Sequence, residues 1–162
     1  MSDGMSEAFK VKLFEEKELD QVVRINWSCL PENHDDSFFL ELYYNYPKTF
    51  VVATVGDKVV GYMMCRMETG FSELRLGIAR KGHIVSVAVL PEYRNKGVGN
   101  TLIGKALENM KEYNVKECYL EVRSSNSTAI NLYKKNGFKY VKTIDAYYKD
   151  GESAYVMART IP

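Results

Sequence analysis

The chain has 162 residues, of which 46% are hydrophobic and 27% are charged, a composition typical of a globular domain with a sizeable core. Its net charge of +1 excludes a general attraction to nucleic acid, so any preference for a charged ligand must come from a local group of side chains. The three cysteines are odd in number and widely spaced, which excludes a disulfide framework and a zinc cluster and indicates a reducing compartment.

The first twenty residues contain no apolar run of the secretory kind, and apolar runs such as residues 59–65 are too short to span a bilayer. We therefore expect a cytoplasmic protein without a membrane partner. Residues 1–8 are polar and are expected to be a flexible N-terminus, followed by a single domain over residues 9–162.

The spacing of apolar residues predicts the elements in the first half of the chain. These are a strand at residues 9–14, helices at residues 16–28 and 36–46, and strands at residues 49–55 and 58–67. Pro31 separates the two helices, and Gly56-Asp57 closes the two strands into a hairpin.

Residues 68–81 show no clear period and are expected to form a loop. Next come a strand that ends at Leu90, a turn, and a helix that begins at Val98. They are followed by a strand at residues 117–122, a short helix at residues 127–135, and strands at residues 138–144 and 154–160. This order predicts a mixed sheet with helices on both faces, in which the strand–helix–strand unit at the centre is a right-handed parallel crossover.

The turn before that helix reads RNKGVGNTL from Arg94 to Leu102. Glycines at 97 and 99 leave no side chain over the first backbone N–H groups of the helix, which lack partners and attract anions. Arg94 and Lys96 add positive charge, so the turn is suited to a pyrophosphate. A glycine pair before a helix is equally consistent with tight-turn chemistry, and the spacing is neither a P-loop nor a Rossmann fingerprint.

Two segments match motifs of the GNAT superfamily of acetyl-CoA-dependent N-acetyltransferases. Residues 94–99 match its Gln/Arg-x-x-Gly-x-Gly/Ala motif, and SNSTAINLYKKNGF at residues 125–138 matches its Asn-x-x-Ala-x-x-Leu-Tyr-x-x-x-Gly-Phe pattern. The chain resembles this superfamily from about Phe9 to Thr160. The resemblance implies one GNAT acetyltransferase domain over residues 9–162. That α/β fold has a mixed, mostly antiparallel seven-stranded sheet with a central splayed parallel strand pair, and about four helices on both faces.

Four further segments are similar to protein N-terminal acetyltransferases, in particular to archaeal enzymes related to the NatA catalytic subunit. They are LPEN (30–33), GHIVSVAV (82–89), LEVR (120–123) and YYKDGESAYVM (147–157). This similarity implies transfer of acetyl from acetyl-CoA directly to the α-amine of protein N-termini in a ternary complex. The family usually carries an aromatic residue after LPEN, where this chain has His34. A GNAT enzyme for a small amine or a ribosomal protein N-terminus, and a non-catalytic acyl-CoA-binding module, stay open as alternatives.

The resemblance implies acetyl-CoA as cosubstrate, with its pyrophosphate on the 94–99 turn and its pantetheine arm along the preceding strand. A backbone N–H of that strand polarises the thioester carbonyl. Asn126 contacts the coenzyme or caps its helix, and Tyr133 protonates the departing thiolate or packs in the core. The residues assigned to acetyl-CoA are Val87, Ala88, Val89, Arg94, Asn95, Lys96, Gly97, Val98, Gly99, Asn126 and Tyr133.

The acceptor α-amine has a reference pKa of about 7.7–8.0, so a weak base or an ordered water suffices to deprotonate it. Glu32, His83 and Glu121 are the candidate bases and, with Tyr133, the candidate catalytic residues. His83 is expected at the start of the central strand and Glu121 on the next strand, and solvent-facing positions are the alternative for both. No metal site is expected, because two ligands do not make one.

The resemblance also implies a narrow slot that admits a free N-terminus and excludes internal lysines. Tyr147 and Tyr148 form one wall, or pack across a hairpin, and Phe39 lines the other. Leu30, Pro31 and Glu32 position the substrate terminus. The cysteines lie in no nucleophile motif, so no acyl-enzyme is expected. The expected partners are protein N-termini and not nucleic acid, and no residue pattern indicates whether an auxiliary subunit or the ribosome binds the chain.

Overall fold

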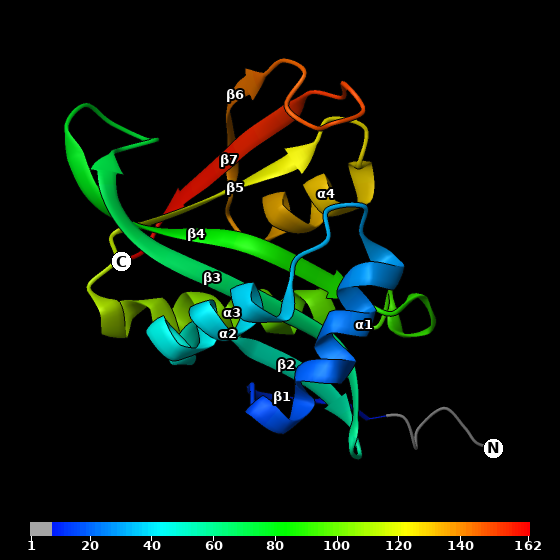
Figure 1. The fold of residues 1–162 in the computed structure, drawn as a ribbon. Helices are drawn as coiled ribbons and strands as arrows, with labels where there is room; N and C mark the ends of the chain where they lie inside the picture. The colour runs from blue at the N-terminus through cyan, green and yellow to red at the C-terminus, as the bar shows by residue number, and fades with distance from the viewer. Residues whose placement is uncertain (1–7) are drawn as a thin grey trace. The chain divides into compact units, whose positions relative to one another are not determined.

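The computed structural model describes residues 8–162, so all but the last residue of the predicted flexible N-terminus lies outside the described residues (Figure 1). The strands are β1 (Lys10–Leu13), β2 (Val51–Val55), β3 (Lys58–Phe71), β4 (Ile78–Val89), β5 (Glu117–Arg123), β6 (Lys139–Ile144) and β7 (Ala154–Thr160). The α-helices are α1 (Leu19–Cys29), α2 (Asp36–Asn45), α3 (Val98–Met110) and α4 (Ser127–Lys135). Short 3-10 helices are η2 (Glu16–Glu18), η3 (Pro47–Thr49), η4 (Pro91–Tyr93) and η5 (Lys111–Tyr113).

The seven strands form one sheet in the order β1-β2-β3-β4-β5-β7-β6. β4 and β5 are parallel, whereas the pairs β1–β2, β2–β3, β5–β7 and β6–β7 are antiparallel. The parallel register joins Lys81, Gly82 and His83 to Glu117, Cys118 and Tyr119 and ends there, although β4 continues to Val89. The predicted mixed, mostly antiparallel seven-stranded sheet with a central parallel pair is therefore confirmed.

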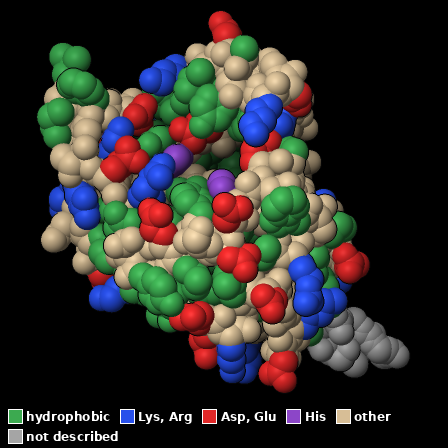
Figure 2. Space-filling view, viewed as in Figure 1, with side chains coloured by type: hydrophobic (Ala, Val, Ile, Leu, Met, Phe, Trp, Pro, Cys, Tyr) green, Lys and Arg blue, Asp and Glu red, His purple; other side chains and the backbone are tan. Residues whose placement is uncertain are grey.

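The contacts of the chain divide into two compact units, residues 1–65 with 85–109 and residues 66–84 with 110–162. β3 and β4 contribute residues to both units. The single domain expected over residues 9–162 stays a prediction. Across the face of the molecule that Figure 2 displays, acidic and basic side chains are interspersed, in keeping with the small net charge.

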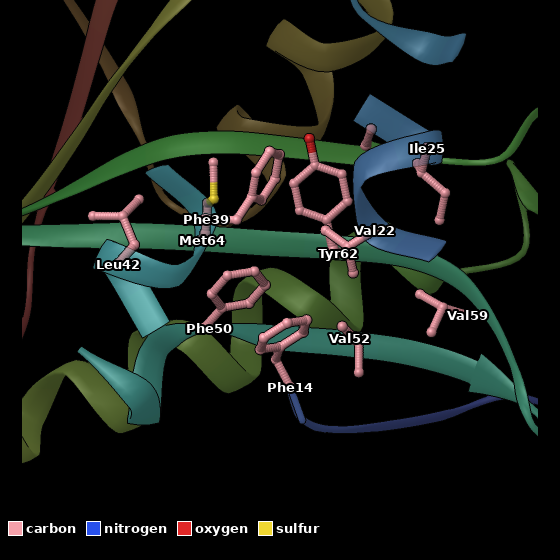
Figure 3. Packing of buried hydrophobic residues seen from close by; sticks show 11 residues of the cluster. Phe14, Val22, Ile25, Phe39, Leu42, Phe50, Val52, Val59, Tyr62 and Met64 are labelled. Carbon is pink, nitrogen blue, oxygen red and sulfur yellow. The ribbon is translucent and has the colours of Figure 1, made fainter. Parts of the chain in front are cut away.

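In the first unit, α1 and α2 cover one face of the strands and bury an apolar cluster (Figure 3). The cluster consists of Phe14, Val22, Ile25, Phe39, Leu42, Phe50, Val52, Val59, Tyr62, Met64 and Ala88. α3 packs on the opposite face, where Gly61 of β3 makes room for it. A Cβ atom at Gly61 would lie 3.4 Å from Val98 of α3 and 3.2 Å from the carbonyl oxygen of Ala88. The absence of a side chain thus allows the first turn of α3 to approach the sheet closely.

In the second unit, the C-terminal end of α4 is tied to β7, because Arg159 of β7 donates through Nη1 to the Asn136 carbonyl at 2.7 Å. Tyr133 of α4 is 6% exposed and meets the buried Phe138 ring edge to face, with centroids 5.9 Å apart. Asn126 caps the N-terminus of α4, and the chain turns at Gly137 before β6 begins. The Asn126 cap was read from the sequence, and the predicted bounds of α4 and β7 are confirmed.

The predicted loop at residues 68–81 is wrong, because β3 continues to Phe71 and β4 begins at Ile78. In this region, some large apolar side chains are exposed and some charged side chains are buried, the reverse of the usual pattern. Phe71 and Ile78 are 79% and 55% exposed, whereas Lys81 and Glu117 are buried. The Lys81 ammonium donates to the Phe71 carbonyl at 2.7 Å and to Glu73 at 2.8 Å. A period read from hydrophobicity cannot detect strands whose buried positions are charged pairs.

Smaller differences lie at element ends. Thr49 belongs to the 3-10 turn η3 and not to β2, and residues 16–18 form the 3-10 turn η2 ahead of α1. Within residues 8–162, no helix has both the length and the hydropathy needed to cross a membrane.

Candidate functional site

His83 and Glu121 form the most enclosed ionisable pair among the predicted site residues. His83 Nε2 lies 2.7 Å from Glu121 Oε1, and the two side chains are only 12% and 16% exposed. The parallel register sets His83 opposite Tyr119, so Glu121 follows two residues later on the same face of β5. The structure therefore brings the two predicted bases together and does not place them facing solvent. His83 lies in the interior of β4 rather than at its start, because β4 begins at Ile78.

The hydrogen bonds of His83 define its tautomer. Arg66 Nη2 lies 3.4 Å from His83 Nδ1, and a guanidinium can only donate. With Arg66 as the donor, Nδ1 accepts, and Nε2 donates its hydrogen to Glu121. In this arrangement Glu121 is the acceptor of the pair. A carboxylate has lone pairs for several hydrogen bonds, so it retains the capacity to accept a further proton donor.

The ring of Tyr119 supports the His83 side of this pair. Its ring stacks on His83 with centroids 4.4 Å apart and planes 4° apart. Its hydroxyl donates to Glu68 at 2.9 Å, and the Lys81 ammonium lies 4.7 Å from its ring centroid. Burial, followed by the hydrogen bond to Glu68, raises the pKa of Tyr119 well above its usual value. Tyr119 stays neutral at physiological pH, and the stacking restrains the plane of the His83 ring.

The loop between β6 and β7 carries Tyr147 and Tyr148 and is held by Arg123 at the end of β5. Arg123 Nη1 donates to Asp150 and to Glu152, each at 2.9 Å, and its guanidinium lies 4.1 Å from the Tyr148 ring centroid. The Ser125 and Arg123 donors lower the pKa of Glu152 to about 2. The two tyrosine rings meet at 87° with centroids 5.0 Å apart, and Tyr147 is 46% exposed. The pair lies in the loop and not within paired strands.

The segment after α1, residues 30–34, is organised by Asn26 of α1. The buried Asn26 amide donates through Nδ2 to the Glu32 carbonyl and accepts through Oδ1 from the His34 N–H, both at 3.1 Å. His34 stacks on Phe38 at 4.6 Å, and burial lowers its pKa. Phe39 is fully buried and touches His34 edge to face at 6.0 Å. Phe39 thus underlies the segment, and its predicted place in the wall of a slot stays a prediction.

Within the same segment, Leu30 packs against the apolar cluster, whereas Pro31 and Glu32 are exposed. The three residues predicted to position a substrate terminus are thus anchored at one end by burial and reach the surface at the other.

The predicted anion turn lies between η4 and α3, and residues 94–97 are exposed. Asn95 and Gly97 have φ angles of 62° and 85°, and a Cβ at Gly97 would meet no atom within 4 Å. Arg94 Nε donates to the Val89 carbonyl at 2.8 Å, which ties the turn to the end of β4. Gly97 therefore leaves open space directly before the first turn of α3, on a turn that carries Arg94 and Lys96, an arrangement that suits an anionic ligand.

The structural alternatives for Asn126 and Tyr133 are both present in the structure. Asn126 Oδ1 accepts the Ala129 N–H at 3.1 Å as the N-cap of α4, and Tyr133 is largely buried. Their contacts with a coenzyme stay predictions. Cys65 and Cys118 are buried, and burial raises the pKa of the Cys65 thiol far above its usual value, so Cys65 is not a thiolate nucleophile. Among residues 8–162, no three His, Cys, Asp or Glu side chains are grouped to hold a metal ion.

Residues 19–138 match the acetyltransferase (GNAT) family. The chain belongs to the GNAT acetyltransferases. It is 52% identical over 144 residues to the N-alpha-acetyltransferase of Sulfurisphaera tokodaii, a match that covers 87% of this chain and 86% of the relative. The resemblance read from residues 94–99 and 125–138 is thereby confirmed.

Two solved structures support the GNAT assignment. Ard1 from Thermoplasma volcanium is 32% identical and superposes with a TM-score of 0.82 over 96% of this chain and 99% of its own. Naa50 from Arabidopsis thaliana, solved in complex with the bisubstrate analogue CoA-Ac-MVNAL, is 28% identical and has a TM-score of 0.79, with 93% and 97% of the chains covered. The predicted GNAT fold is confirmed.

The functional residues that were not predicted from the sequence are those that hold the predicted site residues in place. They are Asn26, Tyr62, Arg66, Glu68, Ser86, Tyr119 and Arg123. For Tyr119 and Arg123 a signal existed, because they alternate with Glu121 on one face of β5. Glu68 carried none, because the strand that contains it was expected to end at residue 67.

Proposed function

We propose that this protein is a protein N-α-acetyltransferase that uses acetyl-CoA as its cosubstrate. The observation that carries the proposal is the 52% identity, over 87% of this chain, to a protein named N-alpha-acetyltransferase. The enclosed His83–Glu121 pair supplies the proton acceptor that such a reaction needs. The three free cysteines are consistent with a reducing compartment, which we take to be the cytoplasm.

The proposed reaction is a direct transfer in a ternary complex. The neutral α-amine attacks the thioester carbonyl carbon, a C–N bond forms, and the C–S bond breaks to release the coenzyme thiolate. The amine proton passes to Glu121 of the His83–Glu121 pair, directly or through a water, and Tyr133 donates its hydroxyl proton to the thiolate. An α-amine with a pKa of about 7.7–8.0 is partly neutral at physiological pH, so a weak base is sufficient.

In the first unit, the Leu30–Glu32 segment is proposed to contact the peptide, with Glu32 near the substrate terminus. In the second unit, Tyr147 and Tyr148 are proposed to contact it. The rigid hold that Arg123 has on the β6–β7 loop and that Asn26 has on residues 30–34 suits both segments to bind a peptide backbone. Protein N-termini are the partner that this function requires.

Acetyl transfer to a peptide panel tests the proposal. The peptides begin with Ser, Ala, Met or Glu, and one further peptide has a blocked N-terminus and an internal lysine. We expect acetyl-CoA turnover with the free N-termini alone, measured by release of free thiol and by mass of the product. Turnover of the lysine peptide only would contradict the proposal and favour an amine acetyltransferase, and coenzyme binding without turnover would favour a binding module.

Arg94→Ala should raise the KM for acetyl-CoA by about ten- to a hundredfold, because it removes a charge-assisted hydrogen bond to the pyrophosphate that is worth about 1.5–3 kcal/mol. It should leave the peptide KM nearly unchanged. Arg94→Lys, which keeps the charge but loses the Nε bond to Val89, should have a smaller effect. Gly99→Val should act like Arg94→Ala by placing a side chain over the helix N-terminus. An unchanged coenzyme KM in Arg94→Ala would remove the pyrophosphate from this turn.

A further inference from the structure

A chain of buried polar groups crosses the apolar cluster of the first unit. Asn26 of α1 and Tyr62 of β3 have no exposed surface, and Ser86 of β4 is 7% exposed. Asn26 Nδ2 lies 3.1 Å from the Tyr62 hydroxyl oxygen, which lies 2.7 Å from Ser86 Oγ. Figure 3 shows the Tyr62 ring beside Phe39, with its hydroxyl directed away from the rest of the cluster. Buried polar groups are retained where they fix a geometry that apolar packing alone does not.

The side-chain amide of Asn26 has two N–H donors and one oxygen acceptor, and this determines which of its hydrogen bonds it donates and which it accepts. The amide nitrogen can only donate, so it gives one hydrogen to the Tyr62 hydroxyl and one to the Glu32 carbonyl. The amide oxygen accepts the His34 N–H. The Tyr62 hydroxyl, which accepts from Asn26, also shares a hydrogen bond with the Ser86 hydroxyl, in which either oxygen can donate. One asparagine thus binds the backbone on both sides of Asn33 and, through Tyr62, reaches β4.

We propose that Asn26 and Tyr62 are positioning residues for the acceptor peptide, acting by holding the Glu32 segment in register with β4. The proposal rests on the proposed function, which places the substrate terminus at Glu32 and the pantetheine arm along residues 87–89. Ser86 directly precedes that part of β4. Both ends of the buried chain therefore lie beside segments to which the two substrates are assigned, within one compact unit.

The role is geometric and involves no proton transfer. Burial raises the pKa of Tyr62 to about 12, so its hydroxyl is neutral at every pH at which the enzyme is assayed. Apart from the Asn26–Tyr62–Ser86 hydrogen bonds, residues 30–34 are held mainly by hydrogen bonds to nearby residues. Leu30 N–H donates to the Asn26 carbonyl at 3.0 Å, and Asn33 Nδ2 donates to the Leu30 carbonyl at 2.8 Å. These local bonds shape the turn, whereas Asn26 and Tyr62 connect it to the sheet through polar groups.

Two nearly isosteric variants test the proposal. Tyr62→Phe removes only the hydroxyl, and Asn26→Asp keeps the size and the acceptor but removes both side-chain donors. We expect the peptide KM to rise about tenfold in each, with the acetyl-CoA KM within about twofold of wild type. Ser86→Ala should give a smaller shift of the same kind. Tyr44→Phe is the matched control, since Tyr44 is 62% exposed and its hydroxyl donates to Glu16 at 2.8 Å, away from residues 30–34 in the sequence.

The kinetic pattern separates positioning from general destabilisation. A variant that is merely less stable loses active enzyme and kcat without a selective rise in peptide KM, and that result would overturn the proposal. So would a peptide KM equal to wild type in Tyr62→Phe, provided that the wild type acetylates N-termini. If Asn26→Asp fails to fold, the peptide KM of Tyr62→Phe alone tests the proposal.

Amide hydrogen exchange separates failure of the inference from failure of the proposed function. If the wild type acetylates no N-terminus, the proposed function fails, and exchange still tests the positioning. We expect faster exchange of the His34 amide in Tyr62→Phe than in wild type, while amides of β5 and β7 are unchanged. Equal exchange at His34 would show that the buried chain does not hold the segment.

Discussion

Glu121→Gln is expected to lower kcat for N-terminal peptides by about 10²–10⁴-fold while the acetyl-CoA KM stays within about twofold of wild type. The substitution keeps the size of the side chain and can still meet His83, but it removes the carboxylate that accepts the amine proton. Steady-state kinetics with acetyl-CoA and a free-N-terminus peptide measure both quantities. Glu108→Gln is the matched control, because the Glu108 side chain is 69% exposed and forms a 3.8 Å ion pair with Lys105 of the same helix.

The double variant His83→Ala with Glu121→Gln shows whether the two residues act as one unit. Because His83 orients the carboxylate through a 2.7 Å contact, its loss adds little once the carboxylate is gone. The residual activity should rise with pH as the α-amine loses its proton, with an apparent pKa of about 7.7–8.0. If the double variant keeps the wild-type kcat, another residue or bulk water is the base.

Phe50→Ala is expected to lower the free energy of unfolding by about 3–5 kcal/mol, because it removes a ring from the closed core of the first unit. Phe50 is fully buried and stacks on Phe14 with centroids 4.1 Å apart. The measurement is denaturant unfolding followed by the fluorescence of Trp27, the single tryptophan, which belongs to α1.

Phe71→Ala is the matched control for this experiment. It makes the same chemical change at a position that is 79% exposed, so the free energy of unfolding should change by less than about 0.5 kcal/mol. If the two variants are destabilised equally, burial does not explain the loss, and the packing shown in Figure 3 does not describe the core in solution.

The elements that were predicted best are those whose ends carry local signals. Asn126 and Gly137 bracket α4, and Asp150-Gly151 precedes β7, so their bounds follow from capping and turn chemistry among neighbouring residues. The ends of β3 and β4 were missed because the partners of Lys81 and Glu117 are charged or polar groups that the fold brings to them. Glu117 accepts from Ser72, which is 45 residues away in the sequence.

The sequence by itself determined the family, the order of the elements and the identity of the side chains able to bind an anion or accept a proton. These depend on motifs, caps and periodicities that act over a few residues. Only the tertiary structure decided which of those side chains meet. The parallel register of β4 and β5 pairs His83 with Glu121, and the packing of α1 on β3 buries Asn26 against Tyr62. Both contacts join residues more than thirty positions apart, and their geometry follows from strand pairing and helix packing, which no local pattern encodes.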